Sequence, residues 1–274
     1  MIPAAFDYRR ASSLPEALQL LSDGGEDAKL IAGGHSLLPL MKLRLAAPSL
    51  LVDIGRLSDL AYVREDGDRI SVGALTRHRD LETNDVLKAH APLLAHVAGQ
   101  VGDPQVRHRG TIGGSVAHGD PASDLPAACL ALGATFVAEG PGGRREIGSD
   151  DFFEGFLETA LRPDEVLVEI NFPKATGAGW SFQKFNRRAQ DWAIVGVAAV
   201  AGARPGVALV NMGATPLRAS AVESALASGS SPTDAAQHAA DGLDPPEDLT
   251  ASAEYRQHLS QVLVRRALEE ALVA

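Results

Sequence analysis

Residues 29–54 read KLIAGGHSLLPLMKLRLAAPSLLVDI, and this segment indicates the class of fold. Short apolar runs at 29–32 and 50–54 are bounded by glycine or proline, which is typical of buried strands. Between them, residues 36–45 alternate apolar and basic positions at helical spacing. A strand, a loop, a helix and a second strand of this total length suit a parallel crossover. We therefore expect an α/β arrangement at the start of the chain.

Outward from this segment, the pattern predicts further elements and one domain boundary. A helix should begin after Ser13, which stands at N-cap spacing from Glu16, and should end at Gly24-Gly25. Further strands are predicted at 68–72, 134–138, 165–172, 180–185, 194–201 and 206–212, and further helices at 89–101, 125–132, 219–227, 233–240 and 251–274, with a loop rich in glycine and serine at 110–124. Residues 173–179 are the best boundary, so we expect one domain at 1–175, with subdomains of about 1–55 and 56–175, and a second at 176–274.

Composition excludes several classes of protein. The chain has 274 residues, of which 45% are hydrophobic and 22% charged, as in ordinary folded domains. The net charge of −10 opposes binding to nucleic acid or to an anionic membrane. No signal segment and no long apolar stretch is visible, so we expect a cytoplasmic protein without stable membrane insertion. Cys129 is the single cysteine, so this chain alone holds no disulfide and no iron–sulfur cluster, and the histidine spacing predicts no metal site.

Two Gly-Gly segments, 32–36 and 111–115, are the candidate binding motifs. Consecutive amides without Cβ bulk can turn toward an anion, and phosphate is the natural guest. Asp124 lies close to the second segment and could accept from a sugar hydroxyl. Each segment alone is more often a plain tight turn, but two of them favour a nucleotide. The Rossmann and P-loop patterns for phosphate binding are both absent. The nucleophile-elbow pattern is absent as well, which argues against a serine hydrolase.

The two motifs lie within longer stretches that resemble a known family. Residues 32–44 (AGGHSLLPLMKLR), 109–115 (RGTIGGS) and 120–127 (DPASDLPA) closely resemble the FAD-binding medium subunit of carbon monoxide dehydrogenase and related molybdenum hydroxylases. Residues 184–193 resemble the start of that family's C-terminal domain, and the resemblance runs nearly end to end. It implies an α+β fold: a two-subdomain FAD-binding domain of the vanillyl-alcohol-oxidase (PCMH) type, then a small α/β domain with a three-stranded antiparallel sheet and a helical bundle.

The resemblance also implies which residues contact FAD. Segments 32–36 and 111–115 would surround the diphosphate, Asp124 would hold ribose or diphosphate-side groups, and Lys184 would lie near the isoalloxazine ring, where a cation stabilises anionic reduced flavin. The full predicted set is Ala32, Gly33, Gly34, His35, Ser36, Leu37, Val101, Thr111, Gly113, Gly114, Ser115, Asp124, Leu161, Lys184 and Trp192. Trp192 either covers a flavin face or fills the interdomain core, and the roles of His35 and His118 stay open. No catalytic residue is predicted on this chain.

The implied function is electron transfer within a complex. FAD would take electrons from a small 2Fe-2S subunit and pass them to an external acceptor, while a large molybdopterin subunit oxidises the substrate. The expected assembly is a dimer of heterotrimers. Two alternatives stay open: a stand-alone flavin oxidoreductase, or an assembly subunit without redox turnover. The substrate (carbon monoxide, an aldehyde, an N-heterocycle or a purine) and the acceptor (quinone, NAD or oxygen) are not determined by this chain.

Overall fold

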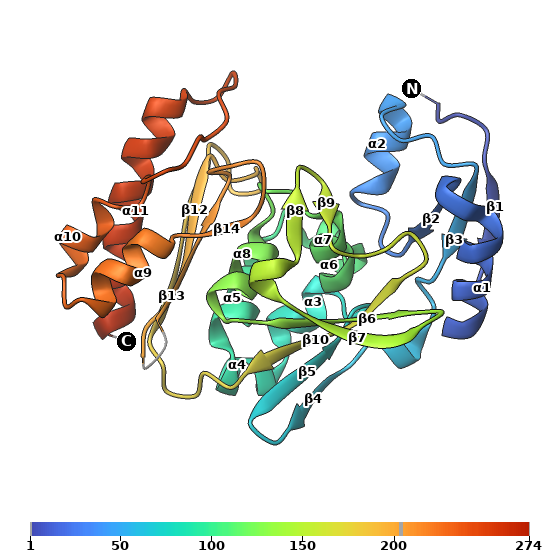
Figure 1. Ribbon diagram of the computed structural model, residues 1–274, viewed down its shortest axis with the longest axis horizontal. Coiled ribbons are helices and arrows are strands. Elements are labelled where there is room, and N and C mark those ends of the chain that lie inside the picture. The colour runs from blue at the N-terminus through green and yellow to red at the C-terminus, as the bar shows by residue number, and fades with distance from the viewer. Residues whose placement is uncertain (1, 203–204, 274) are drawn as a thin grey trace.

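The computed structural model describes residues 2–202 and 205–273. Three bodies follow one another along the chain: a small N-terminal part, a central sheet with its helices, and a C-terminal sheet covered by helices (Figure 1). The two largest apolar cores lie within and between the central and C-terminal parts. None of the helices in the described residues is long and apolar enough to cross a membrane.

The N-terminal part contains the predicted parallel crossover. Its sheet has the order β1-β3-β2, and both pairs of neighbouring strands are parallel. Its elements are β1 (Asp7–Arg10), α1 (Leu14–Gly24), β2 (Ala28–Ile31), α2 (Leu37–Leu43) and β3 (Leu50–Asp53). Ser13 is the N-cap of α1, as predicted, because its hydroxyl accepts from the amide of Glu16 at 3.3 Å. The segment between β2 and α2 is the first glycine motif.

The central part is a five-stranded antiparallel sheet of order β4-β5-β10-β6-β7. Its strands are β4 (Val63–Asp66), β5 (Arg69–Gly73), β6 (Thr135–Gly140), β7 (Gly143–Gly148) and β10 (Val166–Pro173), with a small hairpin of β8 (Phe153–Gly155) and β9 (Glu158–Thr159). The helices are α3 (His78–Thr83), α4 (Asp85–His90), α5 (Pro92–Gln100), α6 (Pro104–Arg109), α7 (Ile112–His118) and α8 (Asp124–Ala131).

Two predictions for this part are wrong. The helix expected over 89–101 is divided into α4 and α5, because Ala91 precedes a proline and has the non-helical angles φ −146° and ψ 56°. The loop expected over 110–124 contains the helix α7, which is capped by Thr111. In the first case a single proline interrupts a segment whose apolar spacing predicts one helix. In the second, tertiary contacts support a helix in a segment whose composition predicts a loop.

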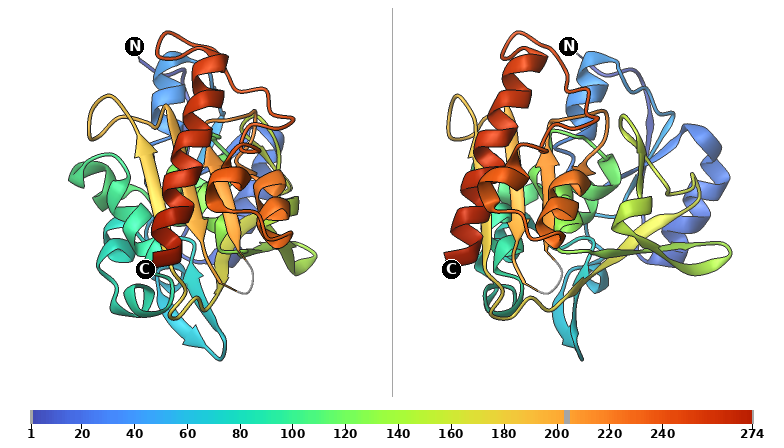
Figure 2. Two further views of the ribbon diagram at one scale, coloured as in Figure 1. Left: turned by 90° about the vertical axis from the view of Figure 1, so that its left-hand side faces the viewer. Right: turned by 60° about the vertical axis from the view of Figure 1, so that its left-hand side comes forward.

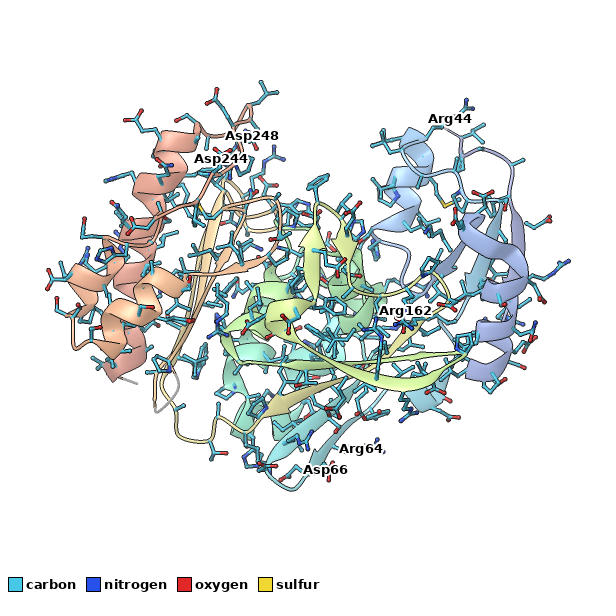
Figure 3. The ribbon with its side chains drawn as sticks, in the orientation of Figure 1. Arg44, Arg64, Asp66, Arg162, Asp244 and Asp248 are labelled. Atoms are coloured by element: carbon cyan, nitrogen blue, oxygen red, sulfur yellow. The ribbon has the colours of Figure 1, made fainter. Side chains whose placement is uncertain are left out.

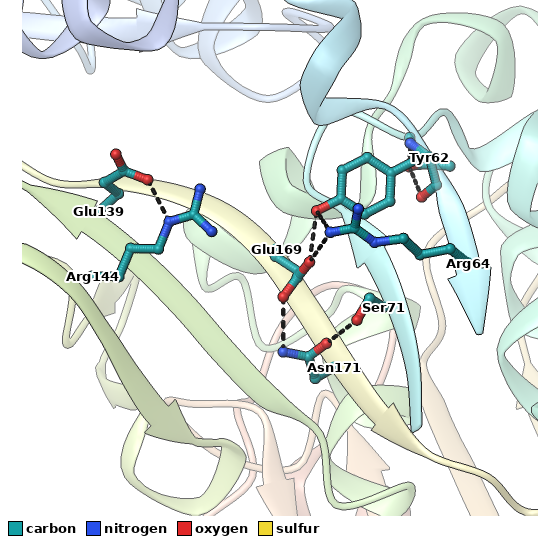
Figure 4. Close-up of polar contacts among 8 residues, drawn as sticks. Tyr62, Arg64, Ser71, Glu139, Arg144, Glu169 and Asn171 are labelled. Carbon is teal, nitrogen blue, oxygen red and sulfur yellow. Dashed lines mark hydrogen bonds and ion pairs between the residues drawn. The ribbon is translucent and has the colours of Figure 1, made fainter. Parts of the chain in front are cut away.

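A polar network covers part of the central sheet (Figure 4). The Tyr62 hydroxyl donates to Glu169 at 2.6 Å, Arg64 donates to the same carboxylate at 3.1 Å, and Asn171 donates to its other oxygen at 3.0 Å. Burial and the neighbouring Glu169 carboxylate raise the pKa of Tyr62 to about 12, so its proton stays on the hydroxyl. The network therefore joins β4 to β10 across the sheet.

The C-terminal part is an antiparallel sheet of order β11-β12-β13-β14. Its elements are β11 (Trp180–Phe185), β12 (Val195–Val200), β13 (Gly206–Val210), β14 (Leu217–Arg218), α9 (Ser220–Ala227), α10 (Pro232–Ala236) and α11 (Ala253–Val273). The three expected strands are present, and the two-residue β14 adds a fourth. The helix expected over 233–240 is shorter, because α10 ends at Ala236 and is followed by turns.

Helices cover both faces of this sheet. α11 lies along the outer face (Figure 2) and packs against apolar residues such as Val197 and Leu209. The opposite face packs on α5 and α8 of the central part, because Ala198 and Ala208 belong to the central core. Every residue of β12 and β13 is buried, and such strands read as continuous apolar runs in the sequence.

A buried arginine attaches the last loop to the C-terminal helix. Arg256 on α11 is fully buried, and it donates to the carbonyl of Ile194 and, at 2.8 Å, to Asp248. Figure 3 labels Asp248 and Asp244 on this loop, at the upper left of the view, whereas Arg44, the C-cap of α2, lies at the upper right on the N-terminal part. Bonds from Thr250 and Ala251 and the charge of Arg256 lower the pKa of Asp248 to about 2, so it stays ionised.

Candidate functional site

The first glycine segment leaves a group of backbone amides unused. Among the described residues, the N–H groups of Gly33, Gly34, His35 and Ser36 donate no hydrogen bond. Gly34 has a φ of 79°, in the left-handed region that favours glycine. A Cβ on Gly33 would lie 2.3 Å from the carbonyl oxygen of Arg109, so only glycine permits this close approach. Four consecutive donors of this kind form a cradle for an anion.

The second glycine segment is built differently. Its amides donate to acceptors of the chain itself: Ile112 to the carbonyl of Thr76 at 3.1 Å, Gly113 to that of Ala74 at 2.8 Å, Gly114 to the Thr111 hydroxyl oxygen at 3.1 Å and Ser115 to the carbonyl of Thr111 at 3.0 Å. The prediction of a second open set of amides is therefore wrong. A Cβ on Gly113 would lie 2.5 Å from that of Ala74, so this glycine permits α7 to pack on the end of β5. A Cβ on Gly114 would instead lie 2.8 Å from Thr111 Oγ1, the one neighbour within 4 Å in the described part of the chain.

The two glycine segments touch and form one site. Gly33 packs against the backbone of Arg109 and Gly110, just before the second segment. The amide of His78 donates to the carbonyl of Gly110 at 3.0 Å, which holds this junction against the start of α3. Segments almost 80 positions apart in the sequence thus meet at a single place.

A cavity of about 290 Å³ opens on one side of this junction, between the central and C-terminal parts. Of the predicted site residues, it is lined by Ala32, Gly33, Gly34, His35, Ser36, Leu37, Val101, Thr111, Gly114, Ser115, Asp124, Lys184 and Trp192. The lining also includes residues that the sequence did not indicate, namely His78, Gly102, Val106, Gly110, Ser123, Gln190 and Asp191. The structure therefore brings residues from both domains to one cavity.

A second cavity, of about 670 Å³, lies on the other side of the junction. Leu161 and Gly113, the two predicted residues outside the first cavity, both line it, as does His118. Burial lowers the pKa of His118, which favours a neutral ring. The two cavities share four lining residues, Ala32, Ser36, Leu37 and Gly114. An elongated ligand could therefore occupy both and pass the free amides midway.

A buried ion pair joins the two domains inside the first cavity. The Lys184 ammonium on β11 donates to Asp124 Oδ2 on α8 at 2.7 Å, and each side chain is only 7% exposed. Lys184 also donates to the carbonyl of Gln100 at 3.0 Å. Burial raises the pKa of Asp124 to about 6, although Lys184 opposes the rise. The second carboxylate oxygen, Oδ1, is buried without a partner among the described residues, which is rare for a polar atom in a protein interior.

The structure also decides between two interpretations of Trp192. Its side chain is 58% exposed and lines the first cavity. The indole therefore does not fill the interdomain core.

His35 is exposed on the first glycine segment, and its own amide is one of the four free donors.

No sequence pattern indicated His78, the more deeply buried of the two histidines that line the first cavity. The residue lies outside both glycine motifs, and no spacing relates it to them. An isolated β-bridge between Arg77 and Thr111 brings it to the site, and this long-range pairing leaves no pattern in the sequence.

Comparison with known proteins assigns the family. Residues 4–175 match the model of the FAD binding domain in molybdopterin dehydrogenase, and residues 180–271 match that of the CO dehydrogenase flavoprotein C-terminal domain. The chain is 44% identical to the carbon monoxide dehydrogenase medium chain of Hydrogenophaga pseudoflava, over 99% of this chain and 98% of that one. It is 40% identical to the 6-hydroxypseudooxynicotine dehydrogenase complex subunit alpha of Paenarthrobacter nicotinovorans, over 99% of this chain and 96% of that one.

The fold agrees with these relationships. The solved structure of Hydrogenophaga pseudoflava carbon monoxide dehydrogenase lacking the Mo-pyranopterin moiety contains a chain that matches this one with a TM-score of 0.94, at 44% identity. The match covers 100% of this chain and 99% of that one. The α+β fold expected from the resemblance, an FAD-binding domain followed by a small C-terminal domain, is confirmed. The chain belongs to the family of FAD-binding medium subunits of molybdenum hydroxylases, the flavoprotein subunits of oxidoreductase complexes such as carbon monoxide dehydrogenase.

Proposed function

We propose that FAD lies across both cavities, with its diphosphate against the free amides of residues 33–36. The observation that carries this proposal is the group of four unused N–H donors at residues 33–36: all four residues line the first cavity, and Ser36 also belongs to the wall that this cavity shares with the second. The diphosphate is the middle part of FAD, so it needs hydrogen-bond donors at this point of the site. Leu37 and Gly114 complete the wall.

The two cavities differ in a way that favours one orientation of FAD. In the first, the unpartnered Oδ1 of Asp124 would accept from a hydroxyl or N–H of the flavin half, and Trp192 would cover the ring at the open side. Lys184 would contribute positive charge beside the ring. In the second cavity, Leu161 would contact the adenosine half. The predicted contacts of Val101, Thr111, Gly113 and Ser115 belong to the same proposal.

The chain would act as the electron-transfer subunit of its complex. FAD supplies the capacity to accept electrons from a donor cluster and to pass them to an external acceptor. Cys129, the only cysteine, is buried in α8 and cannot ligate a cluster alone. We therefore assign the cluster to a small 2Fe-2S subunit and substrate oxidation to a large molybdopterin subunit, in a dimer of heterotrimers. On this view the FAD domain spans about residues 1–175 and the C-terminal domain 176–274.

Substrate choice would then reside on the large subunit. The relatives bear the names of enzymes for substrates as different as carbon monoxide and 6-hydroxypseudooxynicotine, although their flavin subunits are similar to this chain along its length. Nothing in the first cavity needs to recognise such molecules if the substrate never enters it.

Purification of the tagged chain from its native host tests the proposal. We expect two co-purifying chains, iron, molybdenum and about one non-covalent FAD per copy, released by acid precipitation. Gly114→Val, which directs a branched side chain into the shared wall, should remove the flavin, whereas Gly142→Val, at a position with open space around it, should retain it. Flavin that stays on the precipitated protein, or a complex without flavin, would contradict the proposal. If the chain is free of iron and oxidises an organic substrate, a stand-alone flavin oxidoreductase is favoured instead. If the complex assembles but substrate does not reduce its bound flavin, an assembly subunit is favoured.

A further inference from the structure

His78 is a buried residue of the first cavity for which the proposed function has no role so far. It is the first residue of α3, is only 4% exposed, and lines the cavity beside the junction of the two glycine segments. Its ring packs against Gly110: a Cβ on that residue would lie 2.5 Å from His78 Nε2. The glycine at 110 thus makes room for the imidazole, and Nε2 lies next to the backbone that touches Gly33.

The ring has hydrogen-bonding capacity that the chain does not use. In the described part of the chain, the histidine rings that make hydrogen bonds are those of His90 and His238. His78 Nδ1 is buried and has no partner among these residues. An unsatisfied polar atom of this kind costs free energy, so its presence indicates a partner outside the chain or a cost accepted for function.

The charge state and tautomer of His78 follow from its surroundings. Burial, together with the nearby positive charges of Arg77 and Arg107, lowers its pKa to about 4, so the ring is neutral near pH 7. A neutral imidazole has one N–H and one lone pair. Because a buried N–H without an acceptor is rarer in proteins than an unused lone pair, the proton belongs on Nε2 and the lone pair on Nδ1. The donor therefore lies on the side of Gly110.

Two arginines near the ring, Arg77 and Arg107, already donate to groups of the chain. Arg77 donates to the carbonyls of Arg109 and, at 3.2 Å, Gly55. Arg107 donates to Glu82 and, at 3.2 Å, to the carbonyl of Val101. The amides of 33–36 offer four neutral donors to an anion at the junction of the glycine segments.

We propose that His78 Nε2–H donates a hydrogen bond to the diphosphate of FAD, as a fifth neutral donor beside the four amides of the first glycine segment. This inference rests on the proposed function, since it requires FAD at the junction. It makes His78 a cofactor-binding residue that lies outside both glycine motifs. The hydrogen bond accounts for the position of the ring, and the unpaired Nδ1 is the stability cost that accompanies it.

Affinity measurements on the full chain test the role of the N–H. FAD is titrated against ligand-free wild type, His78→Phe, His78→Gln and His96→Phe, and the quenching of flavin fluorescence is followed. We expect His78→Phe to weaken binding about tenfold to a hundredfold, the usual effect of losing a hydrogen bond to a charged group. The glutamine amide places an N–H near the position of Nε2, so His78→Gln should stay within about threefold of wild type. His96→Phe is the matched control, because the His96 ring packs against that of Trp180 at a tilt of 50° and lines neither cavity.

Two further readouts separate binding from a structural role. His78→Phe removes the unpaired Nδ1, so the Tm of the ligand-free chain should be unchanged or higher, whereas a residue that only supports the fold would lower it. The phosphorus resonances of bound FAD should shift in the His78→Gln complex and should coincide with those of wild type in the His96→Phe complex.

The outcomes distinguish this inference from the proposed function. If wild type binds FAD and His78→Phe binds it equally well, the role of His78 is refuted while the FAD site stands. Equal weakening in His78→Phe and His78→Gln, or a Tm that falls together with affinity, would also overturn the role of the N–H. If wild type itself binds no FAD, alone or with its partner chains, the proposed function fails first.

Discussion

Replacing Lys184 by methionine should destabilise the ligand-free chain in a manner that depends on pH. The substitution keeps the apolar stem and removes the ammonium that donates to Asp124 Oδ2 at 2.7 Å and to the carbonyl of Gln100 at 3.0 Å. Because Asp124 Oδ1 already lacks a partner, the variant leaves the whole carboxylate without one. Both side chains of the pair are only 7% exposed, so little water is present to replace the lost partner.

The magnitude depends on whether Asp124 is ionised. With Lys184 present, burial raises the pKa of Asp124 to about 6, and without Lys184 that pKa must rise further. A carboxyl whose pKa is higher in the folded state binds its proton more tightly there, so stability falls as pH rises through the folded-state pKa. In wild type the free energy of unfolding stops falling soon above pH 6, whereas in the variant it continues to fall at higher pH. At pH 8 we expect a loss of about 3–5 kcal/mol, the usual cost of removing one partner of a buried ion pair. At pH 5, where Asp124 is mostly protonated in both proteins, the loss should be about 1 kcal/mol, the value of the hydrogen bonds alone.

Urea unfolding followed by far-UV circular dichroism at pH 5 and pH 8 measures both values. Lys174→Met is the matched control, because Lys174 pairs with Glu65 at 2.7 Å in a more exposed position, where the side chains are 23% and 48% accessible. The Lys174 ammonium holds the pKa of Glu65 below its ordinary value, so this pair is ionised at both pH values, and its loss should have a small effect that is equal at the two. A loss for Lys184→Met that is equal at the two pH values, or larger at pH 5, would refute the reasoning.

Three other expectations concern the holoprotein and the glycine segments. Lys184→Met should lower the midpoint potential of bound FAD and Asp124→Asn should raise it, because they remove charges of opposite sign beside the ring; a redox titration that finds shifts of the same sign would exclude this role. Gly114→Val should purify without flavin and Gly142→Val with it, as the absorbance at 450 nm reports, and equal flavin content would show that Gly114 does not face the cofactor. Gly33→Ala places a Cβ 2.3 Å from a neighbouring carbonyl oxygen, so both Tm and FAD affinity should fall, and an unchanged Tm would contradict the tight contact between the two segments.

Local patterns were sufficient for much of the fold. Ser13 caps its helix, residues 29–54 form a parallel crossover, and the apolar runs of the C-terminal part are strands, because each of these depends on residues close together in the sequence. The predictions failed where distant groups determine the local conformation. Residues 112–118 form a helix although the segment is rich in glycine, and the amides of Ile112 and Gly113 donate to carbonyls almost 40 positions earlier.

The sequence by itself determined the family, the two glycine segments and the candidate contacts, since short motifs are visible without knowledge of the fold. Only the tertiary structure decided that the first segment has free amides while the second has satisfied its own, that Asp124 and Lys184 form a buried pair, and that His78 joins the site. The physical reason is common to all three. Burial and the supply of hydrogen-bond partners come from segments far away along the chain, and neither quantity is encoded in the spacing of neighbouring residues.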